Sequence, residues 1–346
     1  EQGHRSIVIS AGGRLVEQLE REGSEHIAWD VGRKSPLTLL RYIRRLRRFL
    51  QAQHVDILHL RSRMPAWVGY LAWKGMSPQH RPHLVTTVHG MYSVNGYSAV
   101  MTRGEVVIAV SETTRQYVLD HYPSAPSTRL RVIHRGVERT QFPYGYRPST
   151  AWLDTWKRQY PQPEGKHLLT LPGRITRLKG HEDFIRLLAT LKAQGIAAHG
   201  LIVGSAAVDK QPYLQELQQL TQDLGIEDTL TFTGHRNDLR EIMSISSLVL
   251  SLSTQPESFG RTVLEALSLG VPVCGYNHGG VGEQLQALIP EGAIPLGDAK
   301  ALERTVTEFL SSPPAVPRDH SFTLENMLKA TLDVYLTLCG EPSGAA

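Results

Sequence analysis

The stretch SLVLSLSTQPESFGRTVLEALSLGVP, residues 247–272, decides the fold of this chain. Its first part, residues 247–253, is an apolar run with the length of a buried strand. A helix is predicted from Arg261 to Leu269, because the stop signals Gly270 and Pro272 follow it. A buried strand that leads through a short loop into a helix is the repeating unit of α/β proteins with parallel sheets.

Two carboxylates and a helix N-terminus determine the chemistry of this stretch. Glu257 lies in the loop, and Glu265 lies about two turns into the helix at roughly 1.5 Å per residue. Between them, Ser258, Phe259 and Gly260 offer backbone N–H groups at the helix N-terminus, where an anion is favoured. A ligand with hydroxyl groups on both sides of a phosphate, such as a nucleotide sugar, fits this pattern. The alternative is the acidic start of a solvated helix, where Asp and Glu are common.

A second loop from strand to helix carries two cations. The stretch LPGRITRLKG, residues 171–180, places Gly173, Arg174 and Lys179 directly after another apolar run. Gly173 allows the backbone to approach a ligand closely. The two cations strengthen the interpretation of a ligand site, and ordinary solvated charge is the alternative.

The spacings G-R-x-x-x-x-K-G and E-x7-E, in this order and each after a strand, resemble the family 4 retaining glycosyltransferases of the GT-B fold. The downstream segment GGVGE, residues 279–283, belongs to the same resemblance, which covers nearly the whole chain. It implies two Rossmann-like domains with a ligand cleft between them. It also implies that Arg174 and Lys179 bind the donor diphosphate, that Glu257 lies against the donor sugar, and that Glu265 binds the ribose.

Length and alternation support two α/β domains. A chain of 346 residues exceeds one ordinary core, and strand-like and helical runs alternate in two series separated by the Pro-rich segment 161–163. We expect an N-terminal acceptor domain over residues 1–150, a nucleotide-sugar domain over 151–320, and a C-terminal helix and tail over 321–346 that packs back across the domains. Each series predicts a mostly parallel, doubly wound sheet.

The start of the chain departs from the family pattern. The segment EQGHRSIVISAGG, residues 1–13, reads as the end of a first helix followed by the family's second strand. We therefore expect the domain to lack the family's first strand and its Gly-rich loop, as a truncated chain would.

Composition indicates a soluble globular protein without cofactors. The hydrophobic share is 41% and the charged share is 20%, and no apolar run approaches the roughly 18 residues of a membrane span. There is no secretory signal, and the two cysteines, Cys274 and Cys339, form no CxxC pair, so we expect a reducing cytoplasm. No D-x-D pair occurs, which predicts that no metal holds the diphosphate.

Positive charge is concentrated in the first half of the chain. Residues 1–150 hold 21 Lys and Arg against 11 Asp and Glu, and the predicted helix 36–53 carries five arginines beside an apolar stripe. Such a helix can lie on an anionic membrane surface, whereas nucleic acid is not expected because no known binding motif occurs. The alternative is a helix that covers the sheet and whose arginines are simply solvated.

Two further candidates follow strands of the first half. Arg61 and Arg63 come after the third strand, where ligand crevices form in open α/β sheets, so they are candidates for binding an anionic group of the acceptor. The same stretch resembles envelope-glycan members of the family. His89 ends the fourth strand, and the resemblance implies that it is catalytic, together with Glu257, at the donor sugar. An incidental helix-start loop and a structural histidine are the alternatives.

These observations predict a retaining, metal-independent hexosyltransferase. It would move a hexose from a UDP- or GDP-sugar to a glycan or glycolipid acceptor, in the synthesis of envelope polysaccharide or lipopolysaccharide, on the inner face of the cytoplasmic membrane. A sugar-nucleotide epimerase of the same fold and a non-catalytic nucleotide-sugar-binding protein are the alternatives. An NAD-dependent oxidoreductase is disfavoured, because no G-x-G-x-x-G follows a strand.

Overall fold

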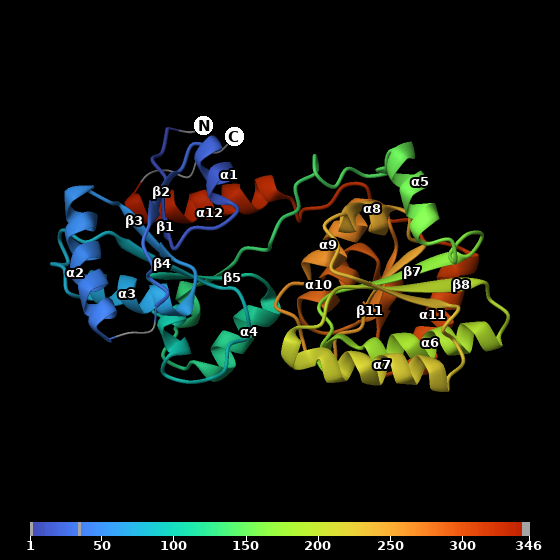
Figure 1. Cartoon of the computed structure of the whole chain (residues 1–346). Helices are drawn as coiled ribbons and strands as arrows, with labels where there is room; N and C mark the ends of the chain where they lie inside the picture. The colour runs from blue at the N-terminus through green and yellow to red at the C-terminus, as the bar shows by residue number, and fades with distance from the viewer. Residues whose placement is uncertain (1–2, 34–35, 341–346) are drawn as a thin grey trace. The chain divides into compact units, whose positions relative to one another are not determined.

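The computed structural model describes residues 3–33 and 36–340 (Figure 1). Contacts divide the chain into two compact units. The first runs from the N-terminus to Val110 and takes in Arg115–Ile133 and the chain from Thr331 on. The second comprises Ser111–Thr114 and His134–Ala330. The domain ranges 1–150, 151–320 and 321–346 stay a prediction.

All strands of the first unit run parallel, which confirms the α/β class, but they form two sheets where one was predicted. β1 (Ile7–Ser10) pairs only with β2 (Glu25–Ala28) among the described residues. The second sheet has the order β3-β4-β5-β6, and its strands are Ile57–Leu60, His83–Val88, Val106–Ala109 and Leu130–Val132. Within the described chain, β1 and β3 are not hydrogen-bonded to each other, and no strand lies between them to join the two sheets.

The helices of the first unit alternate with its strands, as predicted. They are α1 (Val16–Arg21), α2 (Pro36–Ala52), α3 (Arg63–Lys74), the 3₁₀ turns η1 (Ser98–Thr102) and η2 (Ser127–Arg129), and most of α4 (Glu112–His121). The predicted apolar stripe of α2 is confirmed, since Ile43, Leu46 and Leu50 are buried in a cluster with residues of α3. A helical period of 3.6 residues brings these three side chains onto one face, and the arginines lie between them.

The second unit is built on one six-stranded parallel sheet with the order β12-β11-β10-β7-β8-β9. The strands in chain order are β7 (His167–Pro172), β8 (Ala198–Val203), β9 (Leu230–Gly234), β10 (Leu248–Ser251), β11 (Val273–Tyr276) and β12 (Ala293–Ile294). The central strands are apolar and buried on both faces, as expected of a parallel sheet that helices cover on both sides.

The helices of this unit cover both faces of the sheet. From β7 the chain proceeds through β8 to β9 at one edge of the sheet, and it then crosses back to β10 and proceeds through β11 to β12 at the other edge. Because the crossovers are right-handed, the helices of the first half of this path and those of the second half lie on opposite faces of the sheet. Figure 1 shows α6 and α7 below the strands and α8 and α9 above them. The helices are α5 (Thr150–Gln159), α6 (His181–Ala193), α7 (Gln211–Asp223), α8 (Leu239–Ser244), α9 (Arg261–Ser268), α10 (Gly279–Leu288) and α11 (Ala299–Ser311), with the 3₁₀ turns η3 (Arg177–Lys179), η4 (Val208–Lys210) and η5 (Pro290–Gly292).

The C-terminal helix α12 spans Leu324–Cys339, three residues later at its start than the predicted 321. Thr323 sets the start, because its hydroxyl accepts a hydrogen bond from the N–H of Asn326 at 3.1 Å. Residues of α12 up to Ala330 belong to the second unit and those from Thr331 to the first. None of the described helices combines the length and apolarity that crossing a bilayer requires.

Candidate functional site

The two motif loops leave neighbouring strands at the same edge of the sheet. β7 and β10 are paired in parallel, with Leu248 opposite Leu169, so the segments that follow their carboxyl ends lie side by side. A backbone hydrogen bond joins the two loops, since Thr254 N–H donates to the Leu178 carbonyl at 2.9 Å. The fold therefore brings together two stretches that lie about 80 residues apart in the sequence.

The best-defined contact of the site is an ion pair between the two loops. The Lys179 ammonium (Nζ) lies 2.8 Å from the Glu257 carboxylate (Oε1), and both side chains are roughly three-quarters buried. Ser253 donates its hydroxyl to the same oxygen at 2.5 Å. Two donors therefore hold one oxygen of Glu257, and no residue that the structure describes makes a hydrogen bond to its second carboxylate oxygen.

The N-terminus of α9 presents a row of unused donors. Within the described residues, the N–H groups of Ser258, Phe259 and Gly260 donate no hydrogen bond. Phe259 is buried, so its ring is not available to a ligand. The dipole of α9 adds partial positive charge here, and the arrangement can accept an anion.

Two glycines allow this loop to pack closely. Gly260 has φ +87°, and a side chain there would place a Cβ 2.5 Å from a methyl group of Val281. At Gly280, in the first turn of α10, a Cβ would lie 2.5 Å from the Phe259 Cα. The GGVGE segment of the resemblance thus has a physical role, because α10 can approach the Glu257 loop only without side chains at this contact.

Glu265 lies deeper than Glu257. Its side chain is only 12% exposed, and Arg261 donates to it at 3.0 Å from one turn earlier in α9. Burial raises the pKa of the Glu265 carboxyl above its usual range, because desolvation disfavours the charged form more than Arg261 favours it. A buried carboxylate with a single donor partner is suited to accept hydrogen bonds from ligand hydroxyl groups.

The remaining donor-loop residues leave one cation unpaired. Arg174 is exposed and makes no hydrogen bond or ion pair with any described residue. Gly173 has φ +147°, and its α-carbon faces the aliphatic part of Lys179. The predicted residues Gly173, Arg174, Lys179, Glu257, Ser258, Phe259, Gly260 and Glu265 all lie in the second unit, on the loops after β7 and β10 and on α9.

The other predicted residues lie together at one edge of the first unit. Arg61 and Arg63 directly follow β3, and His89 directly follows β4, its parallel neighbour. Arg63 is the first residue of α3, and Arg61 is exposed. Since His89 and Glu257 belong to different units, a role for both at one sugar stays a prediction.

Comparison with known proteins agrees with this geometry. Residues 154–323 match the model of the family described as glycosyl transferases group 1, and residues 1–141 match the model of glycosyltransferase family 4. The chain belongs to glycosyltransferase family 4. This confirms the predicted family and its GT-B fold.

Relatives of this family 4 chain share modest identity with it. It is 28% identical over 247 residues to the N-acetyl-alpha-D-glucosaminyl L-malate synthase of Bacillus anthracis, covering 68% of this chain and 60% of the relative. It is 26% identical over 317 residues to the D-inositol 3-phosphate glycosyltransferase of Salinispora arenicola, covering 82% of this chain and 69% of that relative. The chain thus spans about three-fifths to two-thirds of the length of these relatives.

A solved structure supports the fold over nearly the full chain. The crystal structure of a glycosyltransferase from Rickettsia africae superposes with a TM-score of 0.84 at 26% identity, covering 98% of this chain and 92% of that one.

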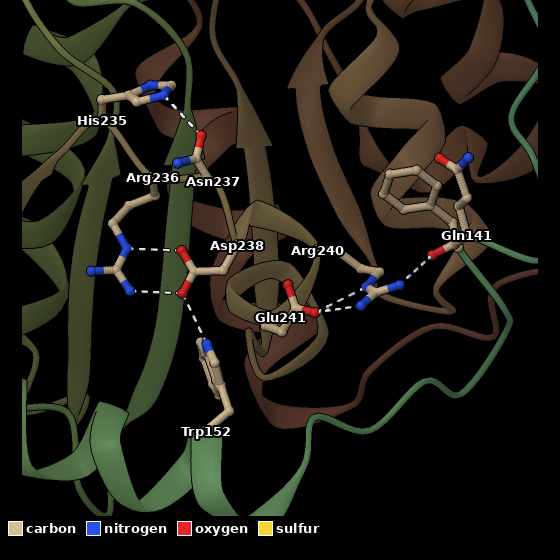
Figure 2. Close-up of a pocket in the computed structure, with 9 residues that line it drawn as sticks. Gln141, Trp152, His235, Arg236, Asn237, Asp238, Arg240 and Glu241 are labelled. Atoms are coloured by element: carbon tan, nitrogen blue, oxygen red, sulfur yellow. Dashed lines mark hydrogen bonds and ion pairs between the residues drawn. The ribbon is translucent and has the colours of Figure 1, made fainter. Parts of the chain in front are cut away.

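The family 4 chain also has a hollow that the sequence analysis did not anticipate. It has a volume of about 730 Å³ and is lined by Gln141, Phe142, Trp152, His235, Arg236, Asn237, Asp238, Arg240 and Glu241. Figure 2 shows its charged groups turned toward one another. Arg236 pairs with Asp238 at 2.7 Å, and Arg240 pairs with Glu241 at 2.5 Å.

This hollow contains none of the predicted site residues. Trp152 donates its indole N–H to Asp238 at 2.8 Å, so the acid is satisfied on both oxygens. The spacing Arg236-x-Asp238 after β9 was the sequence signal that could have indicated it. Because its charges neutralise one another, the hollow offers less to an anionic ligand than the loops after β7 and β10.

In the described part of the chain, no group of three or more His, Cys, Asp or Glu side chains is arranged to hold a metal ion. The expected independence of metal stays a prediction.

Proposed function

We propose that the chain is a retaining glycosyltransferase that moves a hexose from a UDP- or GDP-sugar to a glycan or glycolipid acceptor. The observation that carries the proposal is the pairing of Lys179 with Glu257 beside the unused N–H groups at the start of α9. The cation and the row of N–H donors suit the diphosphate of a nucleotide sugar, and the carboxylate suits the hydroxyl groups of the attached sugar.

The site would act by stabilising the leaving diphosphate. Lys179, Arg174 and the α9 N-terminus would hold the charge that grows as the bond between the sugar carbon and the phosphate oxygen breaks. Glu257 would accept hydrogen bonds from sugar hydroxyl groups, and Glu265 from the ribose. In the retaining reaction the acceptor oxygen bonds to the same face of the sugar carbon, and its proton passes to the departing phosphate oxygen.

We place the acceptor in envelope polysaccharide or lipopolysaccharide synthesis at the cytoplasmic face of an anionic membrane. The support is α2, where Arg41, Arg44, Arg45 and Arg48 are exposed beside Leu40, whose side chain is 53% exposed. Exposed arginines contribute about 1 kcal/mol each near an anionic surface. Sedimentation with vesicles of phosphatidylglycerol and of phosphatidylcholine tests this, because binding should require the anionic lipid and fall when these four arginines become glutamine.

The transferase reaction is tested by incubating the protein with UDP- and GDP-hexoses, with and without an envelope glycan fraction. Transfer should require the acceptor, and the anomeric proton of the product should show the configuration of the donor. Conversion of the donor alone would instead indicate an epimerase. Tight donor binding without turnover would indicate a binding protein.

The same assay tests independence of metal. Activity should survive EDTA, because Lys179, Arg174 and the backbone donors of α9 would meet the charge of the diphosphate in place of a cation held between carboxylates. Loss of activity with EDTA and rescue by Mn²⁺ would contradict this part of the proposal.

A further inference from the structure

Arg63 is held in one orientation by two tyrosine rings. Its guanidinium carbon lies 4.9 Å from the ring centre of Tyr92 and 5.5 Å from that of Tyr97. Arginine stacked on aromatic faces keeps the N–H groups at its edge available. Of its five N–H donors, only one makes a hydrogen bond in the described structure, a long one of 3.4 Å from Nη1 to the Ser98 hydroxyl.

The loop that carries the two tyrosines is itself fixed. Trp67 of α3 donates its indole N–H to the Tyr97 carbonyl at 2.9 Å, and Tyr117 of α4 donates its hydroxyl to the Tyr92 carbonyl. At the end of the loop, the Asn95 side chain accepts the N–H of Ser98 at 2.9 Å. Arg63 is therefore packed against two rings of a loop that is tied to two helices.

Two more polar groups lie next to Arg63 at the same sheet edge. Arg61 is exposed and makes no hydrogen bond or ion pair with a described residue. The Ser62 hydroxyl forms no hydrogen bond to the start of α3, although it occupies the N-cap position. His89 begins the neighbouring loop after β4. A stacked guanidinium, an exposed guanidinium and a hydroxyl that does not cap α3 thus follow β3, next to the loop of the predicted catalytic histidine.

We propose that Arg63, assisted by Arg61, binds an anionic group, phosphate or carboxylate, on the acceptor. The assignment of the anion to the acceptor rests on the proposed transferase function, whereas the anion site itself does not. A guanidinium fork matches two oxygens of a phosphate or carboxylate, and stacking removes most of the ordering cost before the ligand arrives. An arginine that only braced the loop would not need its edge donors unpaired.

Arg103 provides a matched control. It also stacks on aromatic rings, 5.4 Å from the ring centre of Trp67 and 4.9 Å from that of Tyr70. It is exposed and precedes β5, so it lies at the opposite, amino end of the sheet. Arg103→Gln removes a similar cation–aromatic contact without touching the proposed anion site.

The test is calorimetric titration with three sugars. Glucose 6-phosphate carries a phosphate, glucuronate carries a carboxylate, and glucose carries no anionic group. The two charged sugars, or one of them, should bind, and glucose should bind at least tenfold more weakly. Arg63→Gln should weaken the charged sugar at least tenfold, Arg63→Lys should weaken it less, and Arg103→Gln should leave it unchanged. Circular dichroism and the melting temperature of each variant establish that it is folded.

Three results would overturn the proposal: no preference of the parent for a charged sugar, equal binding by Arg63→Gln, or an equal loss in Arg103→Gln. Titration of the same variants with UDP and GDP keeps the two proposals distinguishable. Arg63→Gln should bind both nucleotides like the parent. If the parent binds the charged sugar but neither nucleotide, the transferase proposal fails while the anion site stands.

Discussion

The Lys179 ammonium lies 2.8 Å from the Glu257 carboxylate, so the cation expected at the diphosphate and the carboxylate expected at the sugar form an ion pair with each other. Both side chains are only partly exposed, and Ser253 holds the same carboxylate oxygen. The pair keeps two charges satisfied in a site that excludes part of the solvent. A donor diphosphate would compete with Glu257 for Lys179.

Removal of either donor cation should weaken nucleotide binding. Lys179→Ala and Arg174→Ala should each cost about 1.5–3 kcal/mol in UDP or GDP affinity, the usual range for a hydrogen bond to a charged group. Lys192→Ala is the control, because Lys192 pairs with Asp228 at 2.7 Å on the surface, away from the motif loops. Calorimetry measures all three variants. Unchanged nucleotide affinity in both site variants would place the diphosphate elsewhere.

The two glutamates should differ in their kinetic effects. Glu257→Gln should lower kcat on the order of 100-fold, because a contact with the reacting sugar strengthens in the transition state. Glu265→Gln should raise the donor KM and leave kcat at saturating donor nearly intact, as expected of uniform binding. His89→Ala should resemble Glu257→Gln. Steady-state kinetics measure kcat and the donor KM of the three variants. A larger loss of kcat in Glu265→Gln than in Glu257→Gln, or an unchanged kcat in His89→Ala, would contradict the assignment of Glu257 and His89 to the sugar.

Glu265 should lower stability at neutral pH. Burial raises its pKa in the folded chain, so the unfolded chain ionises first as pH rises, and the stability of the folded state falls across that interval. Glu265→Gln should therefore raise the melting temperature by about 2 °C at pH 7.5, and the gain should shrink toward pH 4. The exposed Glu216, paired with Arg177, is the control, and Glu216→Gln should bring no gain. A gain at pH 4 as large as that at pH 7.5 would rule out charge burial as the cause.

Two buried histidines should make the second unit sensitive to acid. Burial lowers the pKa of His181 and of His199 to about 4, below the unfolded value near 6.5. The unfolded chain therefore binds protons first, and the stability present above pH 6.5 is lost as pH falls through that window. Each histidine accounts for about 3 kcal/mol between pH 7 and pH 4.

His181→Phe isolates this effect, because a phenyl ring occupies the site without titrating. Denaturant unfolding at several pH values should give a smaller loss of stability in this variant than in the parent. His80→Phe, at an exposed histidine, should keep the slope of the parent. Equal slopes in His181→Phe and the parent would contradict a neutral buried His181.

Local signals explain most of what could be predicted. β4 spans His83–Val88, directly before His89, because apolar residues follow the turn signal of Pro82 and precede Gly90. The end of α9 at Ser268 follows from Gly270. The two motif loops could be placed together because each follows a strand of one parallel sheet.

Side-chain contacts and strand pairing over long distances could not be predicted. The ion pair of Lys179 with Glu257 depends on which strands become neighbours, a choice that neither motif contains. The hollow beside Trp152 needs residues from three separate segments. Likewise, the division of the first unit into two sheets depends on pairing between strands rather than on the propensity of any one strand.

That division has a practical consequence for handling the protein. β1 carries the apolar sequence IVIS, and both β1 and β3 have one edge whose backbone groups pair with no described strand. Open strand edges of this kind are templates for pairing with other molecules. Concentrated samples should therefore lose soluble protein through strand-to-strand aggregation that begins in the first unit. A charge on the face of β1 opposite Ile9, which packs against the buried cluster, avoids the core. Val8→Lys should therefore improve colloidal stability more than any change in the sheet of the second unit.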